Sequence, residues 1–145
     1  MNYTQIDRTN CMHIILCEFP DFRTQWDEHL DAWPPFLDRP VALDIEEFAS
    51  FALELISIGI EAEIERLAAT IEVMLVEGDS VISYAFRMMF LKSIANYSHR
   101  NGVSIDRFVT ELKPMGSFYF QSLDTSWNQN IPVVIPDRDS SADIS

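Results

Sequence analysis

Residues 81–97 constrain the fold more than any other stretch of the chain. They are apolar almost all round, and only five polar or basic side chains interrupt them: Ser83, Arg87, Lys92, Ser93 and Asn96. A helix that is apolar on most of its faces usually forms the buried centre of a bundle. The stretch is too short and too interrupted by polar side chains to cross a bilayer. It therefore predicts a central helix that other helices surround.

The rest of the chain supplies amphipathic helices for that role. Between residues 44 and 77 the apolar side chains recur with the helical period of 3.6 residues, and Gly59 interrupts them. We expect a turn or sharp bend at Gly59, because one helix of that length would be long for so small a domain. Shorter helices are expected before Pro20, before Pro34-Pro35, near residues 104–112 and in a last segment that ends at Trp127. The sequence thus predicts an all-α fold, a single irregular bundle of six or seven helices.

We expect residues 1–127 to form this bundle domain and residues 128–145 to form a short extended or disordered tail. Residues 131–136 are apolar and rich in proline, and residues 137–145 are polar. The amino terminus lacks the basic start and apolar core of a signal peptide, which favours the cytoplasm. Cys11 and Cys17 are six residues apart within one predicted helix, so we expect two reduced core thiols and no disulfide between them.

The negative charge of the chain is confined to one part of it. The net charge is −13, and residues 18–79 hold 16 acidic side chains against three arginines, 3 − 16 = −13, so the remainder balances to zero. A field of this sign repels nucleic acid and anionic lipid and steers the chain towards basic partners. We therefore predict a protein partner with a basic surface, and neither nucleic-acid nor membrane binding. Solubility alone is the alternative explanation of the charge.

No motif for catalysis or for a cofactor is recognisable. No two of His13, His29 and His99 have the spacing of a zinc-binding helix, and the cysteines have no evident basic neighbour to activate a thiolate. Four glycines leave little from which to build a phosphate-binding loop. We expect no enzyme activity, no cofactor and no metal. The alternative is a small enzyme or metal-binding protein that uses buried carboxylates.

Three features give a resemblance to a known group: Phe19-Pro20 leading into a helix with Trp26, the apolar helix with Phe90-Leu91, and the turn Leu112-Lys-Pro-Met-Gly116 before the helix that ends at Trp127. In these the chain resembles a loosely defined group of small helical bacterial proteins of uncharacterised function. Some members are thought to be immunity proteins of polymorphic toxin systems. The closing turn departs from the group, in which Gly-Pro is more usual. The resemblance implies a helical fold and, through those members, toxin neutralisation by direct binding.

Clustered acids beside aromatic anchors are the arrangement that such a binder requires. The candidate partner-binding residues are Trp33, Phe36, Asp27, Glu28, Asp31, Asp38, Glu46, Glu47 and Glu54. Trp26 is predicted to be a core residue, and for Trp33 and Phe36 a core position is the alternative. A further alternative is self-association through a partly exposed 81–97 helix.

Overall fold

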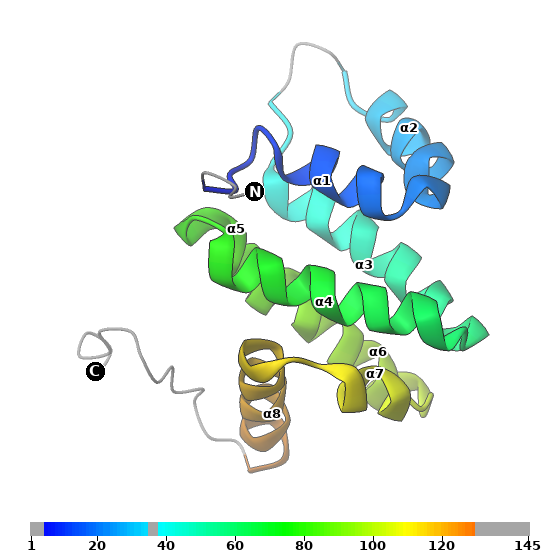
Figure 1. Cartoon of the computed structure of the whole chain (residues 1–145), viewed down its shortest axis with the longest axis vertical. Helices are drawn as coiled ribbons and strands as arrows, with labels where there is room; N and C mark the ends of the chain where they lie inside the picture. Colours follow the sequence, from blue (N-terminus) through cyan, green and yellow to red (C-terminus); the bar gives the residue numbers. More distant parts are fainter. Residues whose placement is uncertain (1–4, 35–37, 130–145) are drawn as a thin grey trace.

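A computed structural model describes residues 5–34 and 38–129, with side chains as far as Leu123 (Figure 1). The helices are α1 (Cys11–Glu18), a 3₁₀ turn (Pro20–Phe22), α2 (Arg23–Asp31), α3 (Val41–Ile58), α4 (Glu61–Glu77), α5 (Ser80–Ala85), a π-helix (Phe86–Leu91), α6 (Lys92–Asn101), α7 (Asp106–Glu111) and α8 (Pro114–Gln129). Because α5, the π-helix and α6 follow one another without a break, we treat residues 80–101 as one rod. The described part of the chain then has seven helices and no strand, which confirms the all-α bundle.

The rod is the centre of the bundle, as the sequence predicts. Phe86, Phe90, Leu91 and Ile94 are fully buried, and α3, α4 and α8 pack against the π-helix. Figure 1 shows α2 at one end of the molecule and α8 at the opposite end. No described helix is long and apolar enough to cross a membrane.

Part of the rod reaches the surface, as the alternative of a partly exposed 81–97 helix expects. Val81 and Tyr84 are 50% and 52% exposed, and Tyr97 is also exposed. The rod is therefore buried on most of its faces but not on all of them.

The helix predicted before Pro20 is α1, and it begins only at Cys11. Ile6 instead forms a parallel β-bridge with Gly78: its amide donates to the Glu77 carbonyl at 3.0 Å, and its carbonyl accepts from the Asp79 amide at 2.8 Å. Backbone groups engaged with a distant segment are not available to a local helix. The side chain of Ile6 is fully buried.

Glycine and aspartate residues stand at the boundaries between α3, α4 and α5. Gly59 ends α3 in the left-handed conformation with φ 81°, which separates α3 from α4 as predicted. Asp79 caps α5, its Oδ1 accepting from the Ile82 amide at 2.9 Å. Gly78 is extended, and its role is spatial, because a Cβ there would lie 2.4 Å from the Met74 carbonyl oxygen.

The last helix begins earlier than predicted, at Pro114, so the expected Pro-Gly turn is its first turn. The side chain of Glu72 in α4 supplies its cap. The Glu72 carboxylate accepts from the amides of Met115 and Gly116 at 3.1 and 3.0 Å. A carboxylate at this position satisfies amides that the helix leaves unpaired and complements its dipole. The helix continues to Gln129, and residues 130–145, with the predicted 131–136 segment, lie outside the described residues.

Candidate functional site

Aromatic packing fixes α2 against α3. Phe22 and Trp26 are buried, and the ring of Phe22 lies 5.4 Å from that of Phe48 and 5.1 Å from that of Phe51. Such ring pairs add to the free energy gained from area burial alone. The prediction that Trp26 is a core residue is confirmed. Trp33 lies beyond the end of α2 and is partly buried.

A buried ionic network lies beside this aromatic packing. The carboxylate of Asp44, on the first turn of α3, accepts from Arg39 through both oxygens: Nε lies 2.6 Å from Oδ1 and Nη2 lies 3.3 Å from Oδ2. His29 of α2 also approaches, with its Nε2 2.9 Å from the same Oδ1. The Arg39 guanidinium covers the ring of Trp26, 5.4 Å from its centroid. The buried charge is thus paired and hydrogen-bonded, as a buried carboxylate must be.

A second set of polar contacts continues the network along the seam between α2 and α3. The Gln25 amide nitrogen donates to Glu47 Oε2 at 2.6 Å and to the Glu47 carbonyl at 3.3 Å. His29 Nδ1 lies 3.5 Å from Glu47 Oε1, so the imidazole lies between two carboxylates. These contacts fix the position of α2 on α3.

Most of the predicted partner-binding acids are exposed on these two helices. On α2 they are Asp27, Glu28 and Asp31, and on α3 they are Glu46 and Glu54; we call these five residues the acidic surface. Because Gln25, Trp26 and His29 face α3, the three α2 carboxylates lie on the opposite side of that helix, towards solvent. Asp27 makes an exposed ion pair with Arg23, at 3.9 Å.

The other predicted residues have different positions. Glu47 is partly buried and engaged by Gln25, so it belongs to the seam. Asp38 is exposed in the segment before α3. Phe36 lies outside the described residues.

Several acids of α4 have structural partners instead of forming a free surface. Glu63 pairs with Arg66 at 3.1 Å, Glu61 pairs with Arg107 at 3.4 Å, and Glu72 caps α8. Carboxylate oxygens of Glu61, Glu65 and Glu111 lie within 4.8 Å of one another, close enough to share a cation. They are exposed or half-buried, and Arg107 already neutralises one of them. Part of the negative charge of residues 18–79 is therefore paired with groups of the same chain.

The two cysteines are free, as predicted, but only Cys11 is a core thiol. Burial raises the pKa of Cys11 to about 12, and the negative charges of Asp44, Asp79 and Asp7 add to the effect. Cys17 is exposed, and its Sγ lies 3.7 Å from Nε2 of His13. The expectation of no basic neighbour is thus wrong for Cys17, and the signal that was missed is the i, i+4 spacing of His13 and Cys17.

Residues 12–128 match a domain family whose function is unknown, DUF7674. The chain belongs to the DUF7674 family. The family is uncharacterised, like the group that the sequence resembles. The family description mentions no immunity function. No curated protein and no solved structure compared with this DUF7674 chain matches it.

The converging side chains of Asp44, Glu47 and His29 are the arrangement that the enzymatic alternative requires. However, both Asp44 oxygens already accept from Arg39, and Glu47 accepts from Gln25. These contacts orient the side chains of Asp44, Glu47 and His29 and join α2 to α3. In this DUF7674 protein the network holds α2 on α3, and α2 carries Asp27, Glu28 and Asp31 of the acidic surface.

Proposed function

We propose that this DUF7674 protein is a protein-binding module, an immunity protein that neutralises a bacterial toxin in the cytoplasm by direct contact. The observation that carries the proposal is the acidic surface on a rigid support. Asp27, Glu28 and Asp31 project from α2, and that helix is fixed to α3 by the Asp44 network and the Phe22–Phe48 packing.

Rigid support matters for the proposal because binding costs less free energy when the contacting groups are already ordered. Exposed carboxylates in the neighbourhood of one helix accelerate encounter with a basic partner. Trp33, partly buried next to Asp31, provides an aromatic anchor of the kind that concentrates binding energy. The proposed partner is therefore a toxin domain with a basic surface.

The first test measures association with a basic toxin domain encoded beside this gene, by stopped-flow at low salt. The variant Asp27→Lys/Glu28→Lys/Asp31→Lys reverses the α2 part of the acidic surface. We expect its association rate to fall by about tenfold or more, with a smaller change in dissociation, because long-range steering acts on encounter.

The matched control is Glu65→Lys/Glu77→Lys/Asp106→Lys, which changes the net charge equally at exposed positions on α4 and α7. We expect a much smaller effect from this control. Equal slowing by both triple variants would show that net charge acts and that the acidic surface has no special role. Absence of any binding to the neighbouring toxin would refute the immunity function.

A growth assay tests neutralisation itself. Cells that produce the toxin domain should survive only when they also produce this chain, and the α2 triple variant should protect them poorly. Circular dichroism of the purified variant, showing an unchanged helical spectrum, would separate lost binding from lost folding. Full protection by that variant would exclude Asp27, Glu28 and Asp31 from the contact.

A further inference from the structure

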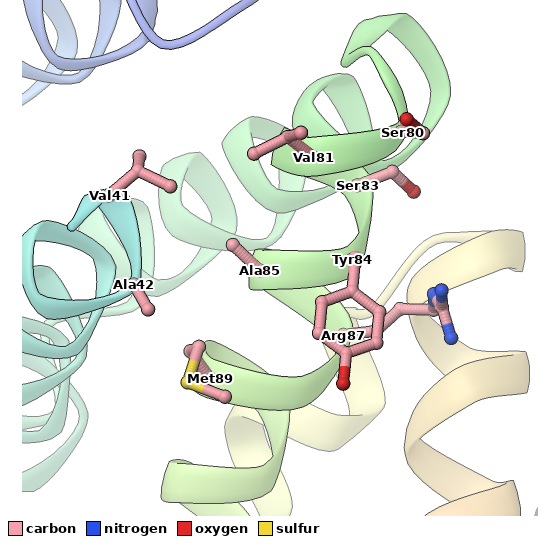
Figure 2. A pocket seen from close by; sticks show the side chains of 9 residues that line it. All are labelled: Val41, Ala42, Ser80, Val81, Ser83, Tyr84, Ala85, Arg87 and Met89. Atoms are coloured by element: carbon pink, nitrogen blue, oxygen red, sulfur yellow. The ribbon is translucent and has the colours of Figure 1, made fainter.

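A pocket of about 430 Å³ lies between the start of α3 and the first part of the rod (Figure 2). Figure 2 shows Val41 and Ala42 of α3 opposite Val81 and Ala85 of α5, with Met89 of the π-helix below them. The ring of Tyr84 stands at one side of the hollow, and the side chain of Arg87 extends beyond it towards α8. Most of the wall is therefore apolar.

Arg87 is held by aromatic rings. Its guanidinium carbon lies 5.3 Å from the centroid of Tyr84 and 5.1 Å from that of Tyr119 on α8. Its Nε is buried and has no hydrogen-bond partner within the described part of the chain. Four other arginines pair with carboxylates: Arg23, Arg39, Arg66 and Arg107. In so acidic a chain, a half-buried cation that contacts two rings and pairs with no carboxylate of the described residues can accept an anion from outside.

The composition of the pocket wall fits such an anion. Arg87 is the only charged residue among those that line this pocket, and the hydroxyls of Ser80, Ser83 and Tyr84 are its other side-chain polar groups. Ser83 already donates to the Leu75 carbonyl at 3.4 Å. An apolar hollow of this size with a few polar groups is the usual form of a small-molecule site. The π-helix that carries Arg87 and Met89 is a rare conformation found frequently at functional sites.

We propose that this pocket binds a small amphipathic carboxylate. Its apolar chain lies in the hollow against Val41, Val81 and Met89 and passes the ring of Tyr84, and its carboxylate is bound beyond that ring by the guanidinium of Arg87. The two tyrosine rings orient the guanidinium in advance, so little side-chain freedom is lost when the anion binds. The site is formed by α3 and the rod and uses no residue of the acidic surface, so it is independent of the proposed function.

The test compares three ligands that share one eight-carbon chain: octanoate, octylammonium and 1-octanol. Each is titrated into the full chain, and amide chemical shifts are followed by NMR. We expect octanoate to bind at least about tenfold more tightly than octylammonium, with shifts centred on the pocket residues. A charge-assisted hydrogen bond of about 1.5 kcal/mol corresponds to this factor.

Arg87→Gln should weaken octanoate binding by about tenfold and leave 1-octanol binding unchanged. Arg100→Gln, which removes the same charge from an exposed position on α6, is the matched control and should change neither. Equal affinities for octanoate and octylammonium, an unchanged octanoate affinity in Arg87→Gln, or shifts away from the pocket would overturn the proposal.

Val81→Trp gives an independent test, because Val81 is half exposed and a larger side chain there fills the hollow without entering the core. We expect this variant to lose binding of both octanoate and 1-octanol while its melting temperature stays close to that of the parent. Retained binding in a folded Val81→Trp protein would overturn the proposal even if Arg87→Gln failed to fold.

Discussion

Asp44 is buried and Arg87 is half-buried, and the two charged side chains have different kinds of partner. Asp44 lies in the acidic part of the chain and has two cationic or potentially cationic partners, Arg39 and His29. Arg87 lies in the electrically balanced part and has two tyrosine rings. The charge of a segment therefore does not reveal what its individual charged side chains do. The partner decides whether a charged group stabilises the fold or stays available to a ligand.

The largest expected effect is the loss of Asp44. Asp44→Ala leaves Arg39 beside Trp26 and His29 without their shared acceptor, and breaking a buried pair in this way costs about 3–5 kcal/mol of unfolding free energy. Urea denaturation measures the change. Glu46→Ala, two residues further along α3 and exposed, should change stability by less than about 0.5 kcal/mol. Similar values for both variants would mean that the network does not stabilise the fold.

Glu72 connects the two regions, because its carboxylate belongs to the acidic segment and caps α8 in the balanced one. Glu72→Ala should cost about 1–2 kcal/mol, the usual range for a lost amino-terminal cap. Hydrogen exchange should show faster exchange at Met115 and Gly116. Glu72→Gln keeps an acceptor oxygen and should recover part of the loss, and unchanged exchange in Glu72→Ala would contradict the capping role.

Replacement of Arg87 should have a smaller effect than either. Arg87→Met keeps an unbranched apolar stem over Tyr84 and Tyr119 and removes only the cation–π attraction. We expect a loss of about 1 kcal/mol in urea denaturation, since such contacts at partly exposed sites contribute about 0.5–1 kcal/mol each. A loss as large as that of Asp44→Ala would show that Arg87 is a structural ion and would remove the contrast between the two sites.

The smallest effect concerns the parent chain itself, in which the reactivity of the two cysteines is measured. This reactivity probes the surroundings of Asp44, because the charge of Asp44 adds to the raised pKa of Cys11. At pH 8 a thiol reagent should modify Cys17 quickly and Cys11 only upon unfolding, because Cys11 is buried as a neutral thiol. Folding raises the pKa of Cys11 from 9.0 to about 12, so its contribution to stability is complete below pH 9 and is lost as the pH rises towards 12. Cys11→Ala removes this dependence. The difference in unfolding free energy between the parent and Cys11→Ala should therefore become smaller between pH 9 and 12. A difference that stays constant over this range would contradict the raised pKa of Cys11.

Local signals in the sequence were sufficient for much of the fold. Gly59 adopts the left-handed conformation at the end of α3, where it predicted a turn, and the apolar 81–97 segment is the buried centre. The start of α1 was not predictable, because it depends on pairing between Ile6 and Gly78, which a local pattern does not contain. The π-helix was missed because its residues have the composition of an ordinary buried helix.

The candidate site was less predictable than the fold. The exposed positions of Asp27, Glu28 and Asp31 follow from helical spacing around the buried Trp26. Burial of Asp44 does not, since an aspartate in the first turn of a helix usually faces solvent, and here Arg39 and His29 come to it from two other elements. The ring contacts of Arg87 likewise join the rod to α8 and leave no trace in local sequence.

The bridge between Ile6 and Gly78 has a consequence for the synthesis of the chain. Ile6 is made 71 residues before Glu77 (77 − 6 = 71), and both its backbone partners, Glu77 and Asp79, must be made before its amide and carbonyl are satisfied. At the usual rates of translation this interval is on the order of ten seconds. Throughout it an isoleucine that is fully buried in the finished protein stays exposed. The segment around Ile6 therefore cannot adopt its native pairing until the end of α4 has been made.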